Sequence, residues 1–182
     1  MGGANLWVRW RVRTGYLVAV VYLWLADPTL RAIAGGVAVA IFGLIVRGAA
    51  AGHLRKGEAL ATSGPYARSR NPLYFGSALL AAGFAIAAHS WIAAAVVAAY
   101  FLLFYPAVMR REEAELRARF SRAFEDYAAL VPLFWPRITA AATRDRDARF
   151  SWGLYRRNRE YRAALGFLAS LGVVVLRMIL RR

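Results

Sequence analysis

The longest uncharged segment of this chain, residues 73–109, contains 37 residues without an aspartate, glutamate, lysine or arginine. As a single α-helix it would be about 55 Å long, whereas the hydrocarbon core of a bilayer is about 30 Å thick. The segment is therefore expected to fold back on itself within a membrane. The polar pair His89-Ser90 near its midpoint predicts the turn, with one helix at 73–88 and the next at 91–109.

Composition indicates the same setting. Of the 182 residues, 60% are hydrophobic, the mean hydropathy is +0.40 and the formal net charge is +15. Lys56 is the only lysine, so arginine carries nearly all of the positive charge. In so hydrophobic a chain this excess is typical of the cytoplasmic face of a membrane protein. Because the chain has no cysteine and two histidines, disulfides are excluded and no metal site is expected.

Two further apolar segments precede the hairpin. Residues 15–26 follow a cluster of arginines and predict a first transmembrane helix. A signal peptide is the alternative, although Asp27-Pro28 is a poor cleavage site. Residues 30–52 predict a second span, and its small residues favour close packing against a neighbouring helix: Gly35, Gly36 and Gly43. The basic connector 53–70 is expected on the cytoplasmic side.

Segment 110–129 has a different pattern. Apolar residues recur at three- and four-residue spacing, at Leu116, Phe120, Ala123, Phe124 and Tyr127. Arginine and glutamate fall four residues apart in three pairs, Arg111/Glu115, Glu113/Arg117 and Glu115/Arg119. We expect an amphipathic helix that lies along the membrane surface with its aromatic stripe inward and ends at Val131-Pro132.

The last apolar run, 163–176, offers 14 uncharged residues before Arg177, which is marginal for a span. If it crosses the membrane, Arg181 and Arg182 lie opposite the arginine-rich connectors, against the positive-inside rule. An interfacial or re-entrant helix is the alternative. The predicted fold class is all-α: a polytopic membrane protein with about five transmembrane helices, including a helical hairpin, plus cytoplasmic amphipathic helices.

The stretch 64–76, GPYARSRNPLYFG, is the first candidate site. Asn71 is predicted to cap the following helix with Pro72 in its first turn, so that free backbone N–H groups and two nearby arginines form an anion-binding corner. Because the hairpin returns to its starting surface, Asn71 and Glu112 are expected on the same side. The simpler interpretations are a basic juxtamembrane turn and, for Glu112 and Glu113, a solvated helix face.

Residues 58–76, EALATSGPYARSRNPLYFG, resemble the motif of the isoprenylcysteine carboxyl methyltransferase and phospholipid methyltransferase superfamily, in which G-x-Y precedes R-H-P-x-Y. About 35 residues later that superfamily has an acidic pair at the end of a membrane hairpin, then a V-P ending. Here the chain reads RREEAELRARFSRAFEDYAALVPLFWP. The resemblance covers about 47–136 and implies an integral membrane methyltransferase that takes its methyl group from S-adenosylmethionine.

The resemblance also implies site residues. Carried over by position, the cofactor-binding residues are Glu58, Ala59, Leu60, Ala61, Tyr66, Asn71, Pro72, Leu73, Tyr74 and Glu112. On physical grounds we add Arg70 as a partner for the methionine carboxylate, with Glu113 and Tyr127 in support. No catalytic acid or base is assigned, because methyl transfer depends on alignment of the reacting atoms. The chain departs from the superfamily's histidine, glycine and tyrosine at three positions: Asn71, Ser121 and Phe124.

The expected function is methyl transfer to a lipophilic or small-molecule acceptor at the cytoplasmic face of a bacterial inner membrane, since the bias towards arginine and alanine is typical of GC-rich bacterial genomes. The methyltransferase domain is expected at 1–137 with its core at 47–136, followed by a basic interfacial segment and an apolar helix at 138–182. One alternative is an NADPH-dependent sterol-type reductase, because such reductases share the R-H-P-x-Y feature. Another is a basic membrane adaptor that binds anionic lipid through 137–162; nucleic acid is not expected as a partner.

Overall fold

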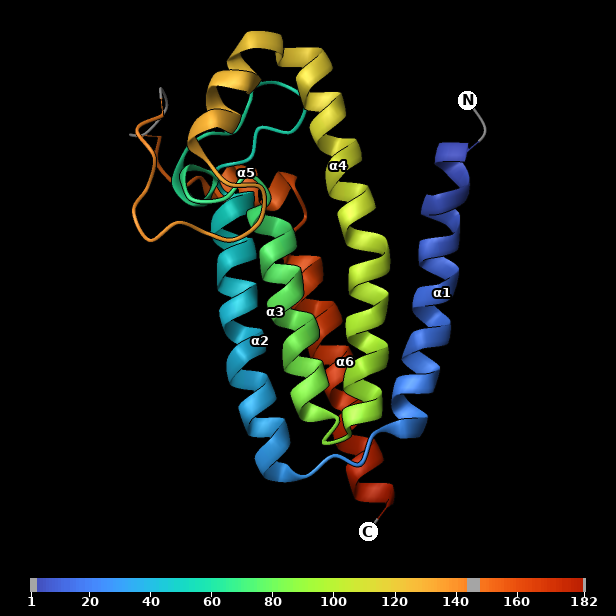
Figure 1. Ribbon diagram of the computed structural model, residues 1–182. Coiled ribbons are helices and arrows are strands. Elements are labelled where there is room, and N and C mark those ends of the chain that lie inside the picture. Colours follow the sequence, from blue (N-terminus) through green and yellow to red (C-terminus); the bar gives the residue numbers. More distant parts are fainter. Residues whose placement is uncertain (1–2, 144–147, 182) are drawn as a thin grey trace.

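The computed structural model describes residues 3–143 and 148–181, and its side chains at Trp10 and from Arg13 onward. All regular secondary structure in these residues is helical, as predicted (Figure 1). The elements are α1 (Gly3–Leu25), α2 (Leu30–Ala51), the 3₁₀ helix η1 (Gly64–Ala67), α3 (Pro72–Ala87), α4 (Trp91–Leu130), α5 (Trp152–Arg157) and α6 (Tyr161–Leu180). Four residues of the basic segment 137–162, namely 144–147, lie outside the described residues, as does Arg182.

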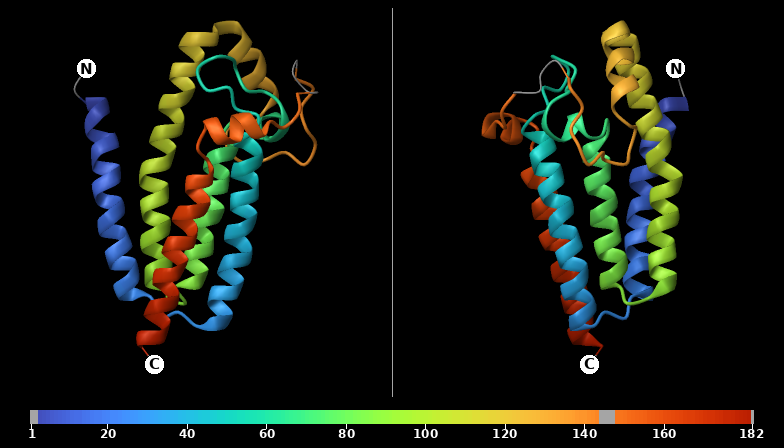
Figure 2. Two further views of the ribbon diagram at one scale, coloured as in Figure 1. Left: turned by 180° about the vertical axis from the view of Figure 1, so that it is seen from behind. Right: turned by 60° about the vertical axis from the view of Figure 1, so that its left-hand side comes forward.

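Three of the described helices are long and apolar enough to cross a bilayer: α2, α4 and α6. The apolar part of α1, Arg13–Leu25, and α3 are shorter than the 18 residues of a minimal span. The all-α membrane fold is thus confirmed, with three helices of full spanning length where about five were expected. Helices α1 and α3 complete an antiparallel bundle with them (Figures 1 and 2).

The predicted hairpin is present. Helix α3 ends at Ala87, and Ser90 caps α4 by accepting a hydrogen bond at its Oγ from the Ala93 N–H at 3.4 Å. His89, with φ of 49°, reverses the chain. The turn lies at the same end of the bundle as the connection from α1 to α2, whereas connector 52–71 lies at the opposite end (Figure 1).

Helices α2 and α3 approach each other through two glycine pairs. A Cβ atom built on Gly36 would lie 2.3 Å from the Gly83 carbonyl oxygen, and one on Gly83 would lie 2.5 Å from that of Gly36. Gly43 and Gly76 face each other likewise, each 2.7 Å from the other's carbonyl oxygen. The prediction of close packing is confirmed for Gly36 and Gly43. At Gly35 a Cβ would make an ordinary contact with a side-chain methyl of Ile86 in α3, at 3.8 Å.

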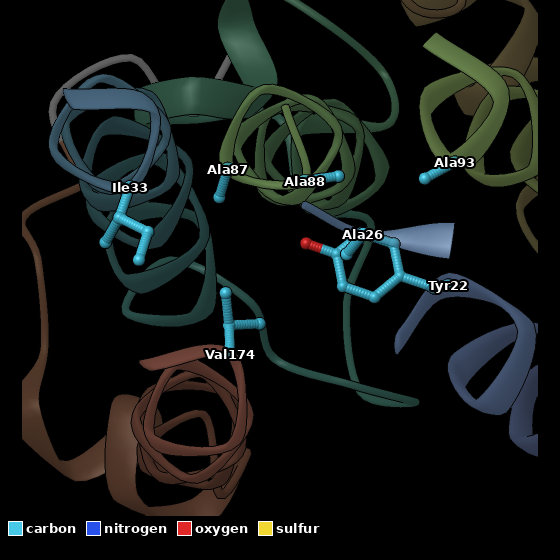
Figure 3. Packing of buried hydrophobic residues seen from close by; sticks show 7 residues of the cluster. All are labelled: Tyr22, Ala26, Ile33, Ala87, Ala88, Ala93 and Val174. Atoms are coloured by element: carbon cyan, nitrogen blue, oxygen red, sulfur yellow. The ribbon is translucent and has the colours of Figure 1, made fainter. Parts of the chain in front are cut away.

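The buried cluster at the hairpin end, which we call the far-end core, draws on five helices (Figure 3). Its residues are Tyr22, Ala26, Ile33, Ala87, Ala88, Ala93 and Val174. The Tyr22 hydroxyl donates to the Phe84 carbonyl oxygen at 2.8 Å. Because these residues are mostly small, the ends of the helices lie close together here.

Helix α6 extends to Leu180 and runs along the bundle (Figure 2), and it is long and apolar enough to cross a bilayer. Arg177 does not end it, because its guanidinium turns to α1: Nε donates to the Leu23 carbonyl at 2.7 Å and Nη2 to that of Trp24 at 3.1 Å. These are among the carbonyls that a helix C-terminus leaves without an intrahelical partner. Arg181 pairs with Asp27 at 3.3 Å. The basic C-terminal end therefore lies opposite the arginine-rich connectors, with local partners for its charge.

The expectation of a separate helix on the membrane surface at 110–129 is wrong. Helix α4 continues through residue 109 and projects beyond the bundle, then reverses at Ser121, whose φ and ψ are 41° and −117° (Figure 1). Arg117 and Glu125 pair across this reversal at 2.5 Å, although eight residues of straight helix would separate them by about 12 Å. Of the three predicted i, i+4 pairs only Arg111–Glu115 forms, at 2.9 Å.

Candidate active site

A cavity of about 660 Å³ lies between the connector after α2, the start of α3 and the projecting part of α4. Its volume falls within the roughly 300–1,000 Å³ of small-molecule and cofactor sites. Of the residues predicted for the site, the following line it: Ala59, Leu60, Ala61, Tyr66, Arg70, Asn71, Pro72, Leu73, Tyr74, Glu112, Glu113 and Tyr127.

Glu58 is the one predicted residue that does not line the cavity. It is exposed and forms an ion pair with Arg157 of α5. The hydrogen bond from Arg157 and its positive charge hold the pKa of Glu58 below its usual range. The connector that carries Glu58 is also held from the other side, because Arg119 of α4 donates to the Gly57 carbonyl oxygen.

The two sequence motifs meet at Tyr74 and Glu112. The Tyr74 hydroxyl donates to Glu112 Oε1 at 2.6 Å, which joins the first turn of α3 to α4. The Tyr74 ring also packs edge-to-face on Tyr105, with the centroids 5.6 Å apart. The predicted return of the hairpin to its starting surface is therefore confirmed at the level of individual side chains.

Arg70 already has partners inside the protein. Its Nε lies 2.7 Å from Glu113 Oε1, and both side chains are largely buried. These two atoms form an ion pair without hydrogen-bond geometry. Arg70 Nη1 donates to the Ala128 carbonyl oxygen at 3.1 Å. Arg70 and Glu113 therefore join the start of α3 to the returning end of α4 and form one wall of the cavity.

The prediction that the Asn71 side chain caps α3 is wrong. Its amide nitrogen instead donates to the Leu133 carbonyl oxygen at 3.1 Å, and no side-chain cap bond forms. Ser69 supports this turn, because its Oγ donates to the Phe134 carbonyl at 2.9 Å and accepts from the Asn71 N–H at 3.2 Å. Residues 131–135 cross the turn and direct carbonyl groups towards it. The Asn71 side chain therefore acts as a hydrogen-bond donor to a carbonyl, whereas capping α3 would have required it to accept from a backbone N–H.

Two buried tyrosines form the cavity's inner side. The Tyr127 hydroxyl donates to the Tyr66 carbonyl oxygen at 2.8 Å, and Tyr127 packs in a cluster with Phe124 and Val131. Tyr66 is only 7% exposed. Its hydroxyl makes no hydrogen bond with the described residues, and burial raises its pKa well above the ordinary value.

Several charged residues of the cavity were not predicted as site residues: Arg47, Arg55, Lys56, Glu115 and Arg119. Arg47 is the least exposed of them. Its Nε pairs with Glu160 Oε1 at 2.5 Å, and its Nη1 donates to the Leu73 carbonyl at 3.2 Å and to Ser77 Oγ. An arginine within an apolar helix is a functional signal in itself, and that signal could have identified Arg47.

A family model described as phospholipid methyltransferase matches residues 10–123. The chain belongs to the phospholipid methyltransferase family. The matched region runs from within α1 to just past the reversal of α4, and it contains every residue predicted to bind the cofactor. Family membership confirms the resemblance on which those residues were chosen, while the residues themselves stay predictions.

Two curated bacterial proteins are similar over 85 residues. The cobalt-zinc-cadmium resistance protein CzcN of Cupriavidus metallidurans is 41% identical, and the nickel-cobalt-cadmium resistance protein NccN of Alcaligenes xylosoxydans xylosoxydans is 40% identical. The aligned part is 47% of this chain but only 39% of the length of each relative. No solved structure gives a significant match. Within residues 3–143 and 148–181, no three His, Cys, Asp or Glu side chains gather into a candidate metal site.

Proposed function

We propose that this chain transfers a methyl group from S-adenosylmethionine to a lipophilic or small-molecule acceptor. Its family is one of membrane methyltransferases, and its apolar helices associate with the lipid bilayer. The observation that carries the proposal is the Tyr74–Glu112 hydrogen bond, which brings the G-x-Y…R-N-P-x-Y motif and the acidic pair together at one cavity.

The chemistry of the cavity suits this methyl donor. Six aromatic side chains line it: Tyr66, Tyr74, Tyr105, Phe120, Phe124 and Tyr127. Aromatic faces attract cations, which suits a sulfonium group. Glu112 provides a carboxylate for an ammonium group. The volume of about 660 Å³ is large enough for S-adenosylmethionine together with part of an acceptor.

The residues bind and align the reactants, and no proton transfer is assigned to them. When bound, S-adenosylmethionine supplies a methyl carbon on a positively charged sulfur, to which a lone pair of the acceptor bonds as the carbon–sulfur bond breaks. Residues 59–61 and the start of α3 form the walls, while Glu112 and Tyr74 fix the polar end. Alignment alone can contribute about 7–11 kcal/mol to lowering the barrier in favourable model reactions. Methyl transfer is therefore compatible with a chain that has two histidines and no cysteine.

We place the site on the cytoplasmic side of a bacterial inner membrane. The cavity opens at the end of the bundle that carries connector 52–71, where Arg55, Lys56 and Arg68 lie. An excess of positive charge favours retention of that end in the cytoplasm. A polar donor then enters from water, and a lipophilic acceptor enters from the bilayer beside the apolar helices.

Binding of S-adenosylhomocysteine to the detergent-purified protein, measured by calorimetry, tests this function. The wild type and His89→Ala, which changes the hairpin turn, should bind it. Glu112→Ala and Tyr74→Ala should lose measurable binding. A wild type that binds NADPH instead would favour the reductase, and one that binds only anionic vesicles would favour the adaptor. Equal affinity in all four proteins would remove the site assignment.

A further inference from the structure

Arg47 is a fixed guanidinium at the inner end of the cavity. Its Nε pairs with Glu160, and its Nη1 bonds to the Leu73 carbonyl and to Ser77. Its Nη2 makes no hydrogen bond with the described residues. Side-chain exposure is 20% for Arg47 and 10% for Glu160, so the pair is shielded from water. The cavity is therefore lined by an arginine that is held in place and still has donor capacity.

Tyr66 provides a second donor beside it. The residue is buried and lines the cavity, yet its hydroxyl has no hydrogen-bond partner among the described residues. Arg47 and Glu112 line the same cavity as Tyr66, and Glu160 is ion-paired with Arg47. An unpaired hydroxyl on a cavity wall is a hydrogen-bond donor available to a ligand atom.

These groups match the two ends of an α-amino acid. Such a ligand has an ammonium and a carboxylate on the same carbon, and it therefore needs an acid close to a set of donors. Glu112 is the acid, while Arg47 and Tyr66 are the donors. Arg70, the arginine that the sequence suggested for this role, is already bound by Glu113 and by the Ala128 carbonyl.

The acid favours a zwitterion over an anionic acceptor in this position. Glu112 would repel a ligand that carries only negative charge, whereas the amino-acid end of S-adenosylmethionine brings an ammonium to Glu112 and a carboxylate to Arg47 and Tyr66.

We propose that Arg47 and Tyr66 bind the carboxylate of the methyl donor, and that Glu160 positions Arg47 for this contact. The assignment rests on the proposed function and names the residues for one end of its cofactor. Glu160 lies at the start of α6, beyond the 10–123 region that the family model matches. Asn158 anchors that segment to the end of α2 and to the connector after it, because its side-chain nitrogen donates to the Ala51 and Leu54 carbonyls at 2.9 and 2.8 Å.

The test compares S-adenosylhomocysteine with its decarboxylated analogue, S-adenosylthiopropylamine, by calorimetry on the full chain. The wild type should bind the analogue more weakly. Tyr66→Phe and Arg47→Lys should each weaken binding of S-adenosylhomocysteine roughly tenfold or more, while affinity for the analogue stays unchanged. Glu160→Gln should reduce the preference for the carboxylate-bearing ligand, and Glu160→Asp should restore part of it.

Arg177→Lys is the matched control, because Arg177 also binds main-chain carbonyls but does so at the far end of the bundle. It should leave both affinities unchanged. Tyr66→Phe removes only one oxygen, so it decides the question even if Arg47→Lys does not fold. Equal losses for the two ligands would overturn the assignment. A wild type that binds neither ligand would instead remove the proposed function, and the assignment with it.

Discussion

The Tyr74 hydroxyl lies 2.6 Å from Glu112 Oε1, although 38 positions separate the two residues in the chain. The contact fixes the start of α3 against α4 at the level where α4 leaves the bundle. It also leaves Glu112 Oε2 available to a ligand while Oε1 is held. The hydrogen bond therefore orients the only acid of the cavity that we assign to the methyl donor.

Tyr74→Phe, Glu112→Gln and the double substitution should reveal this coupling. Each single change should weaken binding of S-adenosylhomocysteine, because the first releases the carboxylate and the second removes its charge. The double variant should bind about as weakly as the weaker single variant, with a coupling of about 0.5–3 kcal/mol. Calorimetry on the four proteins measures this value. Strictly additive losses would show that Tyr74 does not act through Glu112.

Gly36→Ala should destabilise the bundle. The new methyl would lie 2.3 Å from the Gly83 carbonyl oxygen, which belongs to the main chain and cannot rotate away. We expect a loss of about 1–3 kcal/mol in the free energy of unfolding, seen as a lower midpoint of thermal unfolding in detergent. Gly166→Ala is the control, because nothing lies within 4 Å of its Cβ position in α6. An unchanged midpoint for Gly36→Ala would contradict the close packing.

Ser121→Gly should stabilise the protein. Ser121 has φ of 41° and ψ of −117°, a conformation that side chains with a Cβ rarely adopt, and glycine is the superfamily's usual residue here. Relief of this strain should raise the free energy of unfolding by about 1–3 kcal/mol. Ser121→Ala keeps the Cβ and should show no such gain. Similar unfolding midpoints for the two variants would indicate that the reversal carries no strain.

Alkaline pH should weaken the wild type more than Tyr66→Phe. Burial raises the pKa of Tyr66 above that of an unfolded tyrosine, which is about 10. The unfolded chain therefore loses this proton first, and the stability associated with the protonated phenol is full below about pH 10 and falls as pH rises further. Thermal unfolding of both proteins between about pH 8 and 11 measures the difference. If the difference in unfolding midpoint between the two proteins stayed constant above pH 10, Tyr66 would not have a raised pKa.

The fold was predictable where length and hydropathy decide it. A 37-residue uncharged segment must reverse inside a bilayer, and the reversal occurs at His89-Ser90 as its polarity indicates. The same argument brought Asn71 and Glu112 to one side. The continuation of α6 beyond residue 177 was not predictable in this way, because a charged residue after an apolar segment usually indicates the end of a membrane span. Its partners are carbonyls of α1, more than 150 positions away.

The candidate site was predictable where a motif is continuous in sequence. Residues 59–61 and 70–74 line the cavity as the resemblance implied. Arg47 was missed because its ion-pair partner, Glu160, lies 113 positions further along the chain, so no local pattern links them. The reversal at Ser121 was missed because the helical spacing of apolar residues continues on both sides of it. Without that reversal Phe124 and Tyr127 could not reach the cavity.

The two glycine pairs of α2 and α3 set a register with a consequence for the site. Gly36–Gly83 and Gly43–Gly76 are seven residues apart on both helices, and four residues further along α2 the same register brings Arg47 to Leu73 and Ser77. If one helix slid along the other, residues with side chains would replace the glycines at both pairs, and their Cβ atoms would clash with the main chain of the facing helix. The position of Arg47 is thus fixed before any ligand binds. Adjustment of the cavity to different ligands then depends on connector 52–71 and on the projecting part of α4.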